Sequence, residues 1–64
     1  MDKLLDFTNQ VAILTGAASG FGRALAIGLN ERGCKLVLSD VNETGLKETR
    51  SMLTRPSDCL IFTL

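Results

Sequence analysis

The 64-residue sequence contains no histidine, no tryptophan and no tyrosine, and only two cysteines, Cys34 and Cys59. Without histidine, and with no C-x-x-C pair, the sequence gives no zinc signature and predicts no metal site. Free cysteine is usually buried as a small apolar side chain, and we expect this role for both cysteines in a reducing compartment. The disulfides and structural metals that commonly stabilise very small domains are therefore missing.

Net charge and long apolar runs are missing as well. Seven basic and seven acidic residues cancel, so no net field attracts nucleic acid or an anionic membrane. No apolar run approaches the roughly 20 residues that cross a bilayer. Asp2 and Asp6 interrupt the N-terminal segment 1–10, which argues against a secretory or transit signal. We expect an intracellular, cytoplasmic protein with no nucleic-acid and no membrane partner.

Three short apolar runs are present, and such runs are typical of strands buried on both faces. They lie at residues 11–14, 34–39 and 59–64. The two segments between them are long enough for one helix each. The order strand, helix, strand, helix, strand predicts an α/β fold, a partial Rossmann fold in which a βαβαβ unit forms a parallel sheet with helices.

Segment 21–32 has the periodicity of an amphipathic helix. Phe21, Leu25 and Leu29 recur four residues apart and predict the inward face, with Asn30 mostly on the opposite side. We expect Arg23 to be an exposed helical charge, although its place in the first turn also allows a phosphate contact.

A second helix is predicted after Asn42, a residue suited to capping a helix N-terminus. Its inward face would use Leu46, Thr49, Arg50 or Leu53. Gly45 in its first turn costs about 1 kcal/mol relative to alanine. The helix must end before Pro56, because proline disfavours a helical residue before it. The predicted core comprises Leu25, Leu29, Leu36, Leu38 and Ile61.

Successive right-handed crossovers that step in one direction place both helices on the same face of the sheet. The strands are nevertheless apolar at consecutive positions, as in sheets that are covered on both faces. Something outside these residues must therefore cover the second face. We expect residues 1–64 to be the incomplete N-terminal part of a single doubly wound domain.

The segment TGAASGFG, residues 15–22, lies at the predicted junction of the first strand and the first helix. Glycines at such a junction allow a tight turn and let a pyrophosphate approach the backbone, where N–H groups and the helix dipole face it. A P-loop requires lysine and Ser/Thr directly after its last glycine, and Arg23-Ala24 stand there instead. A loop that only reverses the chain remains an alternative.

Asp40 ends the second predicted strand about 20 residues after this loop, where a carboxylate can accept hydrogen bonds from the adenosine ribose. A 2′-phosphate would meet a negative charge there, and Val41 offers no basic group to offset it. The predicted cofactor is therefore NAD, with NADP less favoured. An ordinary loop aspartate near a helix start is the alternative interpretation.

The pattern T-G-x-x-x-G-x-G of residues 15–22 resembles the cofactor fingerprint of classical short-chain dehydrogenases/reductases, and the similarity covers residues 9–64. Phe21 stands where that family more often has isoleucine, which is tolerable because the expected contact is made by the backbone. The resemblance implies a loop along the ribose and pyrophosphate, a ribose-binding Asp40 and a Val41 beside the adenine. The implied cofactor-binding residues are Gly16, Ser19, Gly20, Phe21, Gly22, Asp40 and Val41.

The family's reaction moves hydride between a nicotinamide and an alcohol or carbonyl substrate, with a tyrosine, a lysine and a serine as catalytic groups. This sequence has no tyrosine, and no catalytic residue is assigned in it. The resemblance implies a full-length oxidoreductase with a small-molecule substrate, which we expect to be a homo-oligomer. The alternative is a truncated, catalytically inactive nucleotide-binding or interaction module that uses its open sheet edge.

Overall fold

The structure, a computed structural model, describes residues 6–64, so part of the segment used above to argue against a targeting signal lies outside the described residues. The predicted order of strands and helices is confirmed. No helix in the described part of the chain is long and apolar enough to cross a membrane. The elements are β1 (Val11–Thr15), α1 (Gly20–Glu31), β2 (Lys35–Asp40), α2 (Glu43–Ser51), a 3₁₀ turn η2 (Pro56–Asp58) and β3 (Cys59–Thr63).

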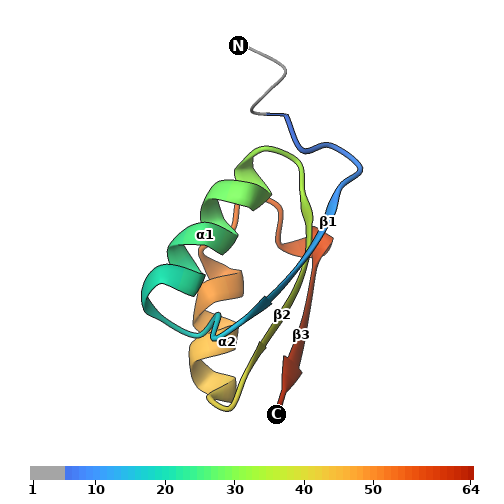
Figure 1. The fold of residues 1–64 in the computed structure, drawn as a ribbon. Coiled ribbons are helices and arrows are strands. Elements are labelled where there is room, and N and C mark those ends of the chain that lie inside the picture. Colours follow the sequence, from blue (N-terminus) through green and yellow to red (C-terminus); the bar gives the residue numbers. More distant parts are fainter. Residues whose placement is uncertain (1–5) are drawn as a thin grey trace.

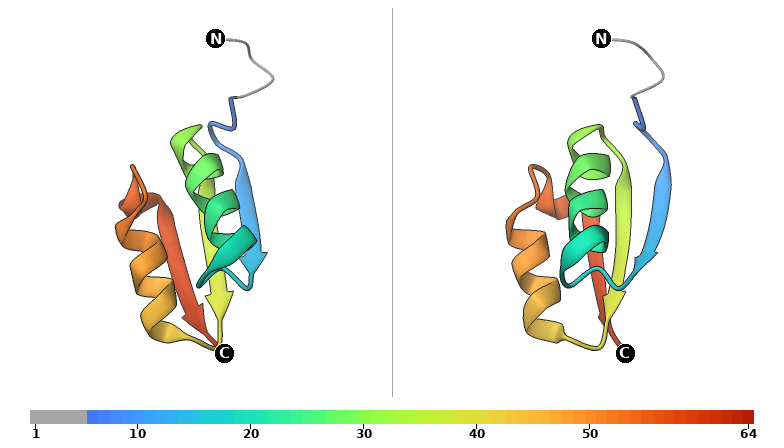
Figure 2. Two further views of the ribbon diagram at one scale, coloured as in Figure 1. Left: turned by 90° about the vertical axis from the view of Figure 1, so that its left-hand side faces the viewer. Right: turned by 60° about the vertical axis from the view of Figure 1, so that its left-hand side comes forward.

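The three strands form one parallel sheet in the order β1-β2-β3. α1 packs on β1 and β2, whereas α2 packs on β2 and β3. Both helices lie on the same face of the sheet (Figure 1 and Figure 2), as the right-handed crossover rule predicts. Because the strands are parallel, the loops that follow β1 and β2 meet at one edge of the sheet, its carboxyl edge.

The core lies between the sheet and the two helices. Leu38 and Leu46 are fully buried there, and Leu36 is 2% exposed. Cys34 and Cys59 are free and buried, as predicted, and desolvation raises the pKa of both thiols. The predicted inward face of α2 is confirmed, and Asn42 caps this helix by accepting a 2.9 Å hydrogen bond from the Gly45 N–H.

The predicted inward face of α1 is confirmed only in part, since Leu29 packs half-buried against the core but Phe21 and Leu25 do not. Phe21 is 83% exposed and Leu25 38% exposed, whereas Ala26 and Asn30 are fully buried. The Asn30 amide pairs with the backbone of Arg55, donating to its carbonyl at 2.9 Å and accepting from its N–H at 2.8 Å. A buried asparagine is tolerated because both ends of its side chain are paired. α1 therefore packs on the sheet through Ala26, the Asn30 amide and the half-buried Ile27 and Leu29.

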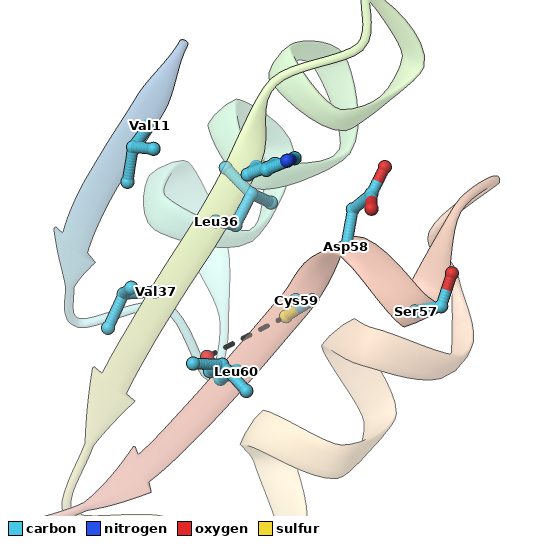
Figure 3. Close-up of a pocket in the computed structure, with 8 residues that line it drawn as sticks. Val11, Leu36, Val37, Ser57, Asp58, Cys59 and Leu60 are labelled. Carbon is cyan, nitrogen blue, oxygen red and sulfur yellow. Dashed lines mark hydrogen bonds between the residues drawn. The ribbon is translucent and has the colours of Figure 1, made fainter. Parts of the chain in front are cut away.

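The second face of the sheet carries Val11, Ile13, Val37, Leu60 and Phe62, and we call it the uncovered face. Within residues 6–64 no element packs over it, and four of these side chains are 54–73% exposed. A hollow of about 360 Å³ lies on this face near the amino ends of the strands. Figure 3 shows Val11, Val37 and Leu60 around it, with Ser57 and Asp58 at the end where β3 begins.

Candidate functional site

The loop between β1 and α1 depends on three glycines. Gly16 has φ +66° and Gly20 has φ +59°, a left-handed conformation that other residues rarely adopt. Gly22 is required for another reason, since a Cβ at this position would lie 2.3 Å from the Gly16 carbonyl oxygen. These glycines let the chain turn sharply and let α1 begin close to the end of β1.

The inner side of this loop is attached to β2 and α2. Ala17 and Ala18 are buried, and the Ala17 N–H donates to the Ser39 carbonyl at 3.2 Å. The Thr49 hydroxyl of α2 donates to the Ala17 carbonyl at 2.7 Å. Gly45 permits this close packing, because a Cβ there would lie 2.7 Å from the Ala18 Cβ. The predicted cost of glycine in α2 is thus offset by contact with the loop.

The outer side of the loop is open. Gly16, Ser19, Gly20 and Phe21 are exposed, and no atom lies within 4 Å of a Cβ built on Gly16 or Gly20. The first N–H groups of α1 have no intrahelical partner and form the positive end of the helix dipole. The first turn holds no acidic side chain, and Ser19 makes no side-chain cap. The donors and the free space therefore fit an anionic group.

Asp40 ends β2 directly beside this loop. Its Oδ2 accepts a 3.1 Å hydrogen bond from the Ala18 N–H, and its Oδ1 accepts one of 3.0 Å from the Asn42 N–H. The Asn42 bond, followed by the Ala18 bond, lowers the pKa of Asp40 below its usual value. The group is therefore a carboxylate at neutral pH, and each of its oxygens keeps a lone pair for a further donor.

Arg23 lies behind the loop rather than in solvent, so the expectation of an exposed helical charge is wrong. Its Nε donates to the Thr49 Oγ1 at 2.9 Å, and one terminal nitrogen contacts the Ala18 carbonyl and, at 3.2 Å, the Gly45 carbonyl. The same nitrogen lies 3.3 Å from a Glu48 carboxylate oxygen. The guanidinium joins α1, the loop and α2.

All seven residues predicted to bind a cofactor lie at the carboxyl edge. Five lie within residues 16–22, where the loop runs into the first turn of α1, while Asp40 ends β2 and Val41 follows it. The Val41 side chain is 75% exposed beside Asp40. Arg23 and Thr49 were not predicted as site residues, because they meet only through the packing of α1 against α2. The described residues contain no group of three or more potential metal ligands.

Comparison with known proteins gives consistent matches. Residues 10–63 match the family described as short chain dehydrogenase. The chain is 43% identical over 60 residues to short-chain dehydrogenase/reductase family 16C member 6 of Bos taurus, covering 94% of this chain and 19% of that protein. It is 41% identical over 59 residues to a CLA biosynthesis dehydrogenase/reductase of Lactiplantibacillus plantarum, covering 91% and 21%.

A solved structure agrees with these sequence matches. The chain superposes with a TM-score of 0.85 and 34% identity on a short-chain dehydrogenase/reductase, glucose/ribitol dehydrogenase, from Brucella melitensis, covering 92% of this chain and 25% of that one. The chain thus spans about a fifth of the length of the two relatives named above. The fold of the matching region is the Rossmann fold, as the element order predicted.

Proposed function

The chain belongs to the short-chain dehydrogenase family, and from this premise we propose that it is the NAD-binding N-terminal segment of an oxidoreductase. The full-length protein would transfer hydride between the nicotinamide and an alcohol or carbonyl substrate. We propose further that residues 1–64 are the first part of one larger Rossmann domain. The observation that carries the proposal is the hydrogen bond between the Ala18 N–H and the Asp40 carboxylate, which joins the glycine loop to the acidic strand end.

In this proposal the loop 16–22 binds the cofactor diphosphate. Gly16 and Gly20 leave the backbone accessible, and the N–H groups of Ser19, Phe21 and Gly22 supply donors near the positive end of α1. The Phe21 side chain is free to differ from the family's isoleucine, since it points into solvent and the contact is made by its backbone.

Asp40 would bind the adenosine ribose, and Val41 would contact the adenine. A carboxylate accepts hydrogen bonds from ribose hydroxyls but repels a 2′-phosphate, so the proposed cofactor is NAD rather than NADP. The two backbone N–H groups that lower the pKa of Asp40 also fix its carboxylate beside the loop, which supports this assignment.

The nicotinamide supplies the hydride chemistry when it is bound. This chain would bind and orient the cofactor, while a proton-transfer group would come from elsewhere in the full-length protein, because the 64 residues hold neither tyrosine nor histidine. The proposed substrate class is a small alcohol or carbonyl compound, and the proposed assembly of the full-length protein is a homo-oligomer.

The test is the cofactor preference of Asp40→Ala in the full-length protein, measured as the dissociation constants of NAD and NADP by calorimetry. The substitution also frees the Ala18 N–H, which affects both cofactors equally, so the ratio of the two constants isolates the ribose contact. We expect NAD binding to weaken about tenfold more than NADP binding, the value of one charge-assisted hydrogen bond.

The matched control is Asp58→Ala, which removes an aspartate at the opposite end of the sheet and should change neither constant. Equal losses for NAD and NADP in Asp40→Ala would remove the ribose assignment. Failure of the unmodified protein to bind either dinucleotide would overturn the proposed function itself.

A further inference from the structure

Two consecutive peptide units of the glycine loop are held by side chains from α1, from α2 and from the end of β2. The unit that joins Ala17 to Ala18 is held at both ends, since the Thr49 hydroxyl donates to its oxygen at 2.7 Å and Asp40 accepts from its N–H at 3.1 Å. The unit that joins Ala18 to Ser19 is held at its oxygen by the Arg23 guanidinium. The orientation of both units is therefore fixed by α1 and α2.

Because a trans peptide unit is planar, the position of the Ala18 oxygen also determines the direction of the Ser19 N–H. In a trans peptide unit the C=O and N–H groups point to opposite sides. Because the Ala18 oxygen faces Arg23 on the inner side, the Ser19 N–H faces the outer side, where Ser19 is exposed. This is the surface to which the first turn of α1 also presents its free N–H groups.

We propose that Arg23 and Thr49 are positioning residues, which fix the Ala17–Ser19 backbone so that the Ser19 N–H points at the cofactor diphosphate. The inference rests on the proposed function for the identity of the ligand. It makes α2 a part of the cofactor site, although α2 itself touches no phosphate. Rotation of the Ala18–Ser19 unit would withdraw a donor from the diphosphate, while the Asp40 carboxylate, which the Asn42 N–H also holds, would keep its contact with the adenosine ribose.

The two side chains suit this role by their chemistry. Thr49 Oγ1 accepts from Arg23 Nε at 2.9 Å and donates to the loop, so the hydroxyl transmits the position of the guanidinium. The rigid fork of arginine reaches Thr49, Ala18 and Gly45 together, whereas a lysine ammonium on a flexible stem is a point charge without fixed geometry. Arg23 is also only 23% exposed in its side chain, which strengthens its hydrogen bonds.

The test compares binding of NAD, NADP, ADP and adenosine to variants of the full-length protein. Thr49→Val keeps the shape of the side chain and removes its hydroxyl, and Arg23→Lys keeps the charge without the fork. We expect both variants to weaken ADP and NAD about tenfold, to leave adenosine within about twofold, and to keep the NAD-to-NADP ratio unchanged. Thr49→Ser should restore wild-type binding, because it retains the hydroxyl.

Matched controls come from the same helices. Thr44→Val in α2 and Arg32→Lys after α1 alter exposed side chains and should change no constant. Circular dichroism establishes that each variant is folded, and if Thr49→Val does not fold, Arg23→Lys and Thr49→Ser carry the comparison. Equal loss of adenosine and ADP would show a general structural role and overturn the inference, as would unchanged ADP binding in the folded variants.

Amide exchange separates this inference from the proposed function. In the 64-residue chain without any ligand, Thr49→Val should speed exchange of the Ala18 N–H, since the peptide unit loses its anchor, while Thr44→Val should not. Unchanged protection of Ala18 would overturn the positioning role even if NAD binds. Faster exchange in a protein that binds no dinucleotide would support the positioning role and refute only the proposed ligand.

Discussion

At the carboxyl edge of the sheet, polar side chains from α1, β2 and α2 form hydrogen bonds within the chain. On the uncovered face of the same sheet, apolar side chains of the strands lie in solvent. Asp40, Thr49 and Arg23 each make two or more hydrogen bonds at the edge. In the described residues, every buried side-chain nitrogen and oxygen has a partner. On the uncovered face, Ile13 is 73% exposed and Leu60 62% exposed.

The difference between these two regions shows that the geometry of the binding loop and the stability of the sheet depend on different parts of the protein. The geometry of the cofactor loop is set by contacts between residues no more than 32 positions apart, so a short segment can specify it. Stability depends on the apolar area removed from water, and one face of this sheet contributes little. The relatives, of which this chain covers about a fifth, have further residues with which to cover such a face.

The largest expected effect contrasts the two faces of the sheet directly. Leu38→Ala on the helix-covered face should reduce the free energy of unfolding by about 2–5 kcal/mol, because it leaves a cavity in a packed core. In the 64-residue chain, at a concentration below that at which it associates, Ile13→Ala on the uncovered face should change it by less than about 1 kcal/mol, since that side chain already lies in water. Urea unfolding followed by circular dichroism measures both. A loss at Ile13 as large as that at Leu38 would mean that the face is covered in solution.

The second prediction concerns association of the 64-residue chain. Exposed apolar area and an open strand edge favour self-association, and sedimentation should detect it. Ile13→Lys should weaken the association constant by about tenfold, the equivalent of about 1.4 kcal/mol. The matched control is Val41→Lys, which places the same charge on an equally exposed residue of the carboxyl edge and should have little effect. A monodisperse monomer with well-protected amides would contradict the prediction.

The fold could be predicted from the sequence because strand and helix periods differ and the breaks between them are marked. The orientation of α2 could also be predicted, because only one face of this helix, the face with Leu46 and Thr49, is suited to burial. α1 has apolar residues on more than one side, and periodicity shows which residues share a face but not which face meets the sheet. Ala26 and Asn30 are buried there beside the half-buried Ile27 and Leu29, while Phe21 and Leu25 are exposed.

The cofactor loop and Asp40 could be found in the sequence because each follows a strand end at a recognisable spacing. The contact between them confirms that the two segments are adjacent, while the binding roles of the residues stay predictions. Arg23 and Thr49 are 26 residues apart and belong to different helices. No local pattern connects them, because their contact depends on how closely α1, the loop and α2 pack. Gly45 was the available signal, since a glycine inside a helix indicates close approach of another segment.

The smallest expected effect is a dependence of the carboxyl edge on acid. The pKa of Asp40 is lowered in the folded chain, so its carboxylate contributes stability above the unfolded value, and that contribution is lost as pH falls through the lower, folded value. The N–H resonances of Ala18 and Asn42 should therefore shift together in NMR spectra, with a midpoint below the ordinary value of 3.8.

Asp40→Asn is the control, because it should abolish this shared titration while it leaves the resonances of the helix-covered core unchanged. A midpoint at or above 3.8 would show that the carboxylate is not held by the two amides. Since these amides belong to the loop and to the cap of α2, a shared titration would also show that one carboxylate connects the two segments. The uncovered face has no part in that contact, so Ile13→Lys should leave the midpoint in place.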